Sequence, residues 1–146
     1  MVYLSACEDY SEQKVRAALE AALSAVQGFS FVKPGMKVVI KTNLVAAAKP
    51  EAAVTTHPAL LCALTDLLTE RGATVVIGDS PGGLYNAVYV NRIYNACGMQ
   101  AVKERGALLN QNFEKTEAEN PAGLVLKRLT YTSYLDDCDA IIDCCK

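Results

Sequence analysis

The sequence predicts a fold of the α/β class, arranged as a three-layer sandwich around a mainly parallel sheet. Short runs rich in valine and isoleucine, such as residues 37–41, 74–78 and 140–145, have the length and composition of buried strands. Between these runs, apolar residues recur at the spacing of amphipathic helices. Alternation of strands with helices of this length is typical of parallel strands joined by right-handed crossovers.

Local signals place the boundaries of the elements expected in the first half. Ser11 supplies a helix cap before an amphipathic segment that Gly28 closes. Thr56 can cap a second helix, with Pro58 in the first turn, where proline is tolerated. Residues 46–54 between them are expected to form a loop of small residues.

The second half is less regular. A helix is expected at 86–97 with Val88 facing inward, and a shorter helix ending near Arg105 follows Gly98. Residues 114–123 are polar and are expected to form a loop. The expected strands in chain order are 2–6, 37–41, 74–78, 107–109, 124–129 and 140–145.

Size and composition predict one domain. The chain has 146 residues, 51% hydrophobic and 21% charged, which is enough to bury a core of its own. We therefore expect residues 1–146 to form a single Rossmann-like α/β domain. Residues 139–146 read as a buried strand with no turn or polar tail after it, whereas chain ends are usually exposed. We expect the chain to be the N-terminal fragment of a longer protein, truncated at its C-terminus.

Charge and cysteine usage exclude several classes of function. The net charge is −2 with both signs interspersed, which gives no footprint for nucleic acid. No apolar run approaches the roughly 20 residues of a membrane helix, and the N-terminus lacks a secretion signal. The six cysteines include no Cys-x-x-Cys pair, and there is a single histidine, so no metal site is predicted. A cytoplasmic protein without nucleic-acid or membrane partners is expected.

Polar residues follow two of the predicted strands and open the helix between them. The carboxyl ends of parallel strands and the helix starts beyond them are where ligands bind in such sheets. We therefore expect a cation, an amide, hydroxyls, an imidazole and a carboxylate to converge on one rim. The candidate site residues are Lys41, Asn43, Thr55, Thr56, His57, Asp79, Ser80, Gly82 and Gly83.

Each candidate has a functional and a structural interpretation. The turn at 78–83 can cradle an anion through its backbone amides, although it matches neither a dinucleotide-binding nor a P-loop motif; otherwise it is a tight glycine turn. Lys41 can pair with an anion or form an imine, or it simply reaches solvent from a strand end. Asn43 can bind ligand or cap a turn.

The single histidine has the widest range of roles. His57 can act as a general base, a metal ligand or a donor to a bound anion, with Asp79 orienting it if the two strand ends adjoin. The alternative is a surface histidine beside a helix cap. Ser80 has no surroundings that resemble the nucleophile elbow of hydrolases.

These motifs resemble the family called domain of unknown function 362. The shared pattern comprises Lys-x-Asn-Leu-Val at 41–45, Thr-Thr-His-Pro at 55–58, the segment 72–83 ending in Gly-Asp-Ser-Pro-Gly-Gly, and Tyr-Leu-x-x-x-Asp-x-Ile-Ile at 134–142. The resemblance extends along essentially the whole chain. A weaker likeness, to the N-terminal domain of nickel-dependent lactate racemases, concerns the fold alone.

The resemblance implies more than the residues themselves do. In that family a Lys-x-Lys-Thr-His motif follows the last strand, so Lys146 would be its first lysine and a ligand-binding residue. Many members carry a ferredoxin-like domain with iron–sulfur clusters further along the chain, and the cluster-binding cysteine runs are missing here. The resemblance therefore implies no cofactor in this chain and iron–sulfur clusters in a missing C-terminal domain.

Three functions remain as hypotheses. The first is a ligand-binding domain of a redox-associated cytoplasmic protein that binds an anionic small molecule over the candidate site. The second is a racemase- or isomerase-like enzyme that abstracts a proton next to a carboxylate, with His57 as base and Lys41 as electrostatic clamp. The third is a structural or partner-docking domain, in which the polar groups of the rim would be splayed apart.

Overall fold

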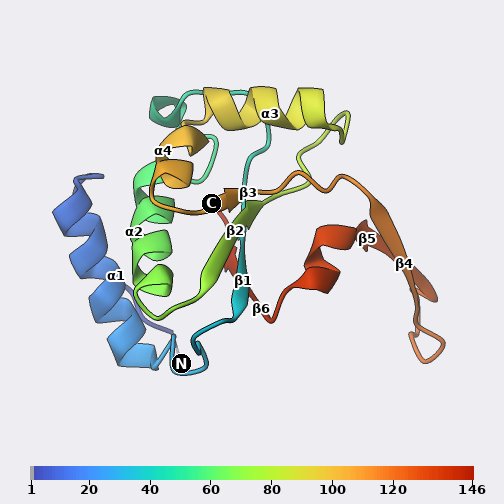
Figure 1. The fold of residues 1–146 in the computed structure, drawn as a ribbon, viewed down its shortest axis with the longest axis horizontal. Coiled ribbons are helices and arrows are strands. Elements are labelled where there is room, and N and C mark those ends of the chain that lie inside the picture. Colours follow the sequence, from blue (N-terminus) through green and yellow to red (C-terminus); the bar gives the residue numbers. More distant parts are fainter. Residues whose placement is uncertain (1) are drawn as a thin grey trace.

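A parallel sheet forms the centre of the molecule. The computed structural model describes residues 2–146. Four strands, β1 (Lys37–Thr42), β2 (Thr74–Gly78), β3 (Leu108–Leu109) and β6 (Ala140–Cys144), lie in the order β3-β2-β1-β6 (Figure 1). Every neighbouring pair is parallel. The predicted α/β class and its parallel sheet are confirmed.

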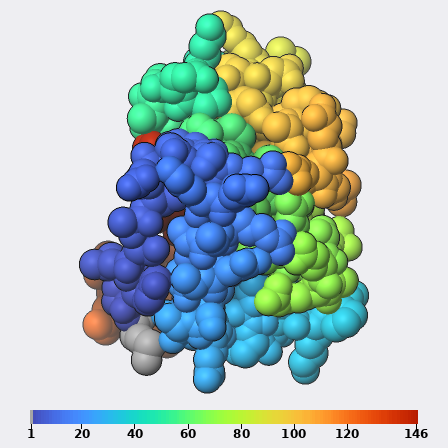
Figure 2. Space-filling view, turned by 90° about the vertical axis from the view of Figure 1, so that its left-hand side faces the viewer, coloured from blue at the N-terminus to red at the C-terminus, as the bar shows by residue number. Residues whose placement is uncertain are grey.

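Helices cover one face of this sheet. Helix α2 (Pro58–Thr69) packs against β2, and α1 (Glu12–Val26) lies on its outer side (Figure 1). Helix α4 (Met99–Glu104) packs against α2 and β3, and α3 (Ala87–Ala96), which contacts α4, runs across the upper end of the strands in Figure 1. A short 3₁₀ helix, η1 (Pro50–Ala52), precedes α2. Figure 2 looks onto this side, where α1 occupies the centre of the face in blue.

The main core lies between the helices and the sheet. Alternate strand residues point to this face, among them Val38 and Ile40 of β1 and Ile77 of β2, all fully buried. From the helix layer, Leu61 and Leu68 of α2 pack into the same cluster. Fully burying one such aliphatic side chain contributes roughly 1.5–3 kcal/mol, so this cluster holds α2 on the sheet.

The 3₁₀ helix η2 (Ser133–Asp137) covers part of the opposite face and provides the third layer. Its Tyr134 packs on Val39 of β1 and Val76 of β2, which are the strand residues that point away from α2. Lys41 is the next residue of β1 on the same face, so it lies beside this second, smaller cluster.

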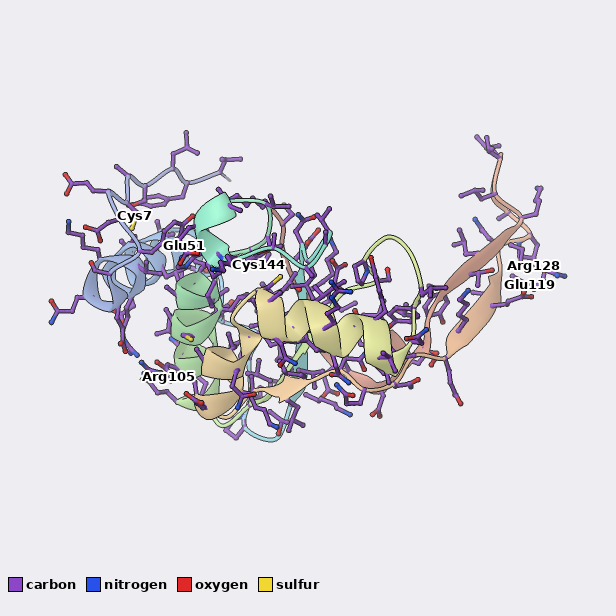
Figure 3. All side chains as sticks on the ribbon, turned by 90° about the horizontal axis from the view of Figure 1, so that it is seen from above. Cys7, Glu51, Arg105, Glu119, Arg128 and Cys144 are labelled. Carbon is purple, nitrogen blue, oxygen red and sulfur yellow. The ribbon has the colours of Figure 1, made fainter. Side chains whose placement is uncertain are left out.

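A two-stranded antiparallel hairpin projects from the body of the molecule. Strands β4 (Lys115–Glu119) and β5 (Arg128–Thr132) pair from Lys115 opposite Thr132 to Glu119 opposite Arg128. Figure 1 shows the hairpin extending away from the sheet, and Figure 3 shows Glu119 and Arg128 close together far from the helices.

Two predictions about this part of the chain were wrong. Residues 114–123 were expected to form a loop, but their alternating pattern of lysine, threonine and glutamate supplies cross-strand pairs in place of a buried face. A strand was expected at 124–129, but β5 begins at Arg128, and the apolar residues before it lie in the exposed connection. Leu124 is 99% and Val125 87% exposed, because no element covers them.

Three further details differ from expectation. Residues 2–6 form no strand and are exposed, because no neighbouring strand pairs with them. Val88 is 85% exposed; Asn86 caps α3 by accepting a hydrogen bond from the Tyr89 N–H, which turns Val90 to the core instead. The cap of α2 is His57 and not Thr56, as described below.

A cavity between the sheet and the hairpin

A cavity of about 600 Å³ lies on the face of the sheet that carries η2. Lys41 of β1 and the turn at 79–83 after β2 form one part of its wall. The hairpin forms another, with Lys115 of β4 and Thr130 and Thr132 of β5. The volume falls within the range of roughly 300–1,000 Å³ that is usual for small-molecule sites.

Strand register places three of the four hairpin residues of the lining on one face of the hairpin; the fourth is Tyr131. Lys115 lies directly opposite Thr132, and residues opposite one another in an antiparallel pair share a face. Thr130, two positions before Thr132, shares it too. One ammonium group and two hydroxyls therefore lie together on the hairpin side of the cavity.

Neither lysine of the cavity is held in a strong ion pair. Lys41 Nζ lies 3.6 Å from Asp143 Oδ1, and both side chains are partly exposed. An ion pair of this kind is worth about 0–1 kcal/mol and yields readily to a better partner. Lys115 forms no ion pair with any carboxylate of residues 2–146.

Asp79 shapes the turn at the edge of the cavity. Its side chain is buried, and Oδ2 accepts a hydrogen bond from the Leu44 N–H at 2.7 Å. Oδ1 accepts a second from the Ser80 N–H at 2.9 Å. Bonds to an ionised acceptor are among the stronger ones in proteins, so Asp79 ties the segment after β1 to the turn after β2.

Three tyrosines line the cavity, of which Tyr134 is buried and Tyr85 is partly buried. Tyr134 lies over Gly78 so closely that a Cβ at that position would lie 2.7 Å from its ring. Burial raises the pKa of Tyr134 to about 12 and also raises the pKa of Tyr85. Both phenols therefore stay protonated at neutral pH and can donate hydrogen bonds.

Asn43 and Thr56 take part in a different set of contacts. Thr56 Oγ1 accepts a hydrogen bond from the Asn43 N–H at 2.9 Å and donates one to the carbonyl of Cys144 at 2.7 Å. Asn43 Nδ2 donates to the carbonyl of Val54 at 3.3 Å. Thr55 is buried, and its hydroxyl has no hydrogen-bond partner among residues 2–146. These residues tie β1, the start of α2 and β6 together.

His57 is the N-cap of α2. Its Nδ1 accepts a hydrogen bond from the Ala59 N–H at 3.1 Å, and its ring stacks on Tyr10 with centroids 3.7 Å apart. Burial lowers the pKa of His57, and the positive charge of Lys146 lowers it further. The imidazole is thus held neutral, with Nδ1 as acceptor.

The structure divides the expected site into two groups. Lys41, Asp79, Ser80, Gly82 and Gly83 line the cavity. Among the described residues the lining includes none of the other five candidates, which are Asn43, Thr55, Thr56, His57 and Lys146.

Strand alternation is the cause of this division. Lys41 points to the same face as Val39, toward η2, whereas α2 and its cap lie on the opposite face. The expected pairing of His57 with Asp79 is therefore not formed, since each has other hydrogen-bond partners.

Sequence reasoning missed the hairpin side of the cavity. Lys115, Thr130 and Thr132 lie in segments expected to be loop or outside a strand. The alternation of residues 115–119, followed by a turn with Pro121 and Gly123 and a second alternating run, was the available signal for a hairpin.

The described part of the chain has neither a cluster of metal-binding side chains nor a helix suited to a bilayer. Within residues 2–146 there is no group of three or more His, Cys, Asp or Glu side chains that could hold a metal ion. Over the same residues, none of the helices combines the length and the apolar character that crossing a bilayer requires.

Comparison with known proteins decides the family. The sequence profile of the family described as Domain of unknown function (DUF362) matches residues 38–146. The chain belongs to this family. The match begins in β1 and includes all cavity residues named above as well as the resembling segments at 41–45, 55–58, 72–83 and 134–142. The comparisons do not show the weaker likeness to lactate racemases.

One curated relative of this DUF362 chain is a longer protein. A thylakoid-associated protein of Synechocystis sp. is 33% identical over 81 residues, which make up 55% of this chain and 25% of that protein. The chain thus spans about a quarter of the length of the relative it matches. No solved structure matches.

Proposed function

We propose that this DUF362 domain binds an anionic small molecule in the cavity between the sheet and the hairpin. The observation that carries the proposal is the meeting of two lysines, Lys41 and Lys115, at one cavity that also holds hydroxyl donors. Such a set of donors favours carboxylate or phosphate groups, which accept several hydrogen bonds at once.

The turn after β2 supports the proposal through its backbone. A Cβ at Gly82 would meet no atom within 4 Å, so the backbone there is open to the cavity. Gly83 has a φ of +104°, which side chains other than glycine rarely adopt. Successive backbone amides without side chains above them can approach an anion closely.

Asp79 does not oppose an anion as strongly as its charge suggests. Both carboxylate oxygens already accept hydrogen bonds from backbone amides, those of Leu44 and Ser80, which offset part of the negative charge. Its role in the proposal is to position the turn, while Lys41 supplies the charge that faces the cavity.

The alternative in which His57 abstracts a proton from a carboxylate held by Lys41 has no support in this geometry. The imidazole serves as the cap of α2, and its surroundings are Tyr10, Lys146 and Glu51. A general base must be within hydrogen-bond reach of the proton that it takes. The redox-associated partner domain, which the resemblance implies, and the cytoplasmic location, which the composition and charge led us to expect, stay predictions.

Isothermal titration calorimetry with inorganic phosphate and with acetate tests the proposal. We expect binding by the wild type and a loss of affinity of at least about tenfold in Lys41→Met, because a charged hydrogen bond is worth roughly 1.5–3 kcal/mol. Lys103→Met, which removes the same charge from α4 outside the cavity, is the matched control. Equal affinity of all three proteins for either anion would contradict the proposal.

A further inference from the structure

We infer that the ligand carries two separated anionic groups, as a dicarboxylate or a phosphorylated carboxylate does. The inference rests on the proposed function and narrows its substrate class. Its basis is that the two cavity lysines come from different walls, each with its own hydrogen-bond donors.

The first anion position lies at the ends of β1 and β2. Lys41 is in register with Gly78, so its backbone lies beside the turn that follows that glycine. Ser80 and the open backbone of Gly82 line the cavity at the same end. One ammonium group, one hydroxyl and backbone amides are thus available to a single anionic group.

The second position lies on the hairpin. Lys115 stands opposite Thr132 in the β4–β5 register, and Thr130 follows on the same face. These residues supply an ammonium group and two hydroxyls, and none of the described carboxylates pairs with the Lys115 ammonium. The Lys115 ammonium is thus available to a second negative charge on the ligand.

The size and the lining of the cavity fit an extended molecule. Its volume of about 600 Å³ equals that of about 20 waters at ~30 Å³ each, far more than one carboxylate group fills. Tyr134 and Leu135 of η2 line it together with the two anion positions and offer apolar surface to a carbon spacer. Joining two anions through a spacer raises affinity, because the second group binds at a high effective concentration.

Calorimetry on the chain of residues 1–146 with two series of probes tests the inference. The probes are the straight-chain dicarboxylates from succinate to suberate and the monocarboxylates of matching length. We expect at least one dicarboxylate to bind the wild type at least about tenfold more tightly than its matched monocarboxylate. We expect Lys115→Met to abolish that difference while leaving monocarboxylate binding at the Lys41 position.

Two further variants separate the loss of the second anion position from a general effect of charge. Lys127→Met removes a hairpin lysine outside the cavity lining and is expected to keep the preference for dicarboxylates. Thr132→Val, which keeps both lysines and suits a strand, is expected to weaken dicarboxylate binding only, so the second position is tested without any change of charge.

The outcomes separate the two proposals. If monocarboxylates and dicarboxylates bind equally and depend on Lys41 alone, the inference is overturned and the proposed function stands. If neither series binds and phosphate does not bind either, both are overturned. A dicarboxylate preference that persists in Lys115→Met would also overturn the inference, because its second anion position would then be elsewhere.

Discussion

Gly78 is the single residue on which the shape of the cavity depends most directly. The ring of Tyr134 lies where a side chain at Gly78 would be, with two ring carbons and the phenol oxygen within 2.8 Å of an added Cβ. The phenol can therefore close the inner wall of the cavity only because β2 ends in glycine.

Replacing Gly78 with alanine is expected to destabilise the protein by roughly 1–3 kcal/mol, since the ring of Tyr134 must move to relieve the overlap. Urea denaturation measures the change in the free energy of unfolding. Gly82→Ala is the control, because nothing lies within 4 Å of a Cβ there. If both variants lost the same stability, the close packing of Tyr134 on β2 would be disproved.

His57 acts on stability through its cap. His57→Ala removes the acceptor of the Ala59 N–H and is expected to cost about 1 kcal/mol, whereas His57→Asn keeps a cap. The comparison of the two variants by urea denaturation at pH 7.5 measures the cap alone. A larger loss in His57→Asn than in His57→Ala would contradict this role.

The same residue predicts a pH dependence with a definite sign. The pKa of His57 is lowered from 6.5, first by burial and then by Lys146, so the folded state favours the neutral ring. This contribution to stability is fully present above about pH 6.5 and is lost as pH falls through the lowered pKa. Protonation of Nδ1 also removes the cap acceptor. His57→Asn is expected to lose less stability than the wild type between pH 7.5 and 5.

At the scale of elements, the hairpin is the part whose position matters most to the cavity, and Asp136 of η2 fastens it. The carboxylate accepts a hydrogen bond from Tyr131 Oη at 2.6 Å and another from Thr116 Oγ1 at 2.8 Å, one from each strand. The hydrogen bond to Asp136 raises the pKa of Tyr131, so the phenol remains a donor.

Asp136→Ala is expected to loosen the hairpin without unfolding the sheet, because it removes both hydrogen bonds from β4 and β5 and none from the core. Hydrogen-exchange mass spectrometry should show faster exchange at 115–119 and 128–132, with β1 and β2 unchanged. Glu104→Ala, an exposed acidic residue at the end of α4, controls for the loss of charge. Unchanged exchange in the hairpin would mean that Asp136 does not hold it.

The elements also show how far sequence reasoning reaches. The strands at 37–42, 74–78 and 140–144 were predictable because each is an apolar run that pairs within the parallel sheet. The expectation that residues 139–146 are buried was wrong, because β6 lies at the edge of the sheet and leaves Ile141 52% exposed. The hairpin was not, because its strands are stabilised by cross-strand polar pairs and have no apolar face to recognise. Residues 2–6 have a strand-like pattern, yet pattern alone supplies no neighbouring strand to pair with.

The candidate site was predictable to the extent that it follows from strand ends. Lys41 and the turn at 79–83 do meet, since β1 and β2 are adjacent and parallel. His57 lies apart because it caps α2, and α2 packs on the other face of the sheet. That choice is a property of tertiary packing, and no local spacing encodes it.

At the scale of the whole molecule, the exposure of each cysteine provides a test of the fold. Cys7 and Cys145 are exposed, whereas Cys97 and Cys144 are buried. Figure 3 shows Cys7 at the outer side of the helix layer and Cys144 within the body. Burial raises the pKa of Cys144 to about 11, which keeps it a thiol and unreactive.

Alkylation with iodoacetamide at pH 8 is therefore expected to modify Cys7 and Cys145 rapidly, and Cys97 and Cys144 only after urea unfolds the chain. Peptide mass spectrometry over time measures each rate. Rapid modification of Cys144 in the native protein would show that β6 does not pair stably with β1.

The most direct measurement of the central claim is a titration of ¹⁵N-labelled protein with inorganic phosphate and succinate, followed by amide chemical shifts. Binding in the cavity predicts shifts at Gly82, Gly83 and Lys115, with Thr55 and Thr56 unaffected. Shifts confined to residues 55–57, with the turn after β2 and the hairpin unchanged, would place the anion on the other face of the sheet and contradict the account.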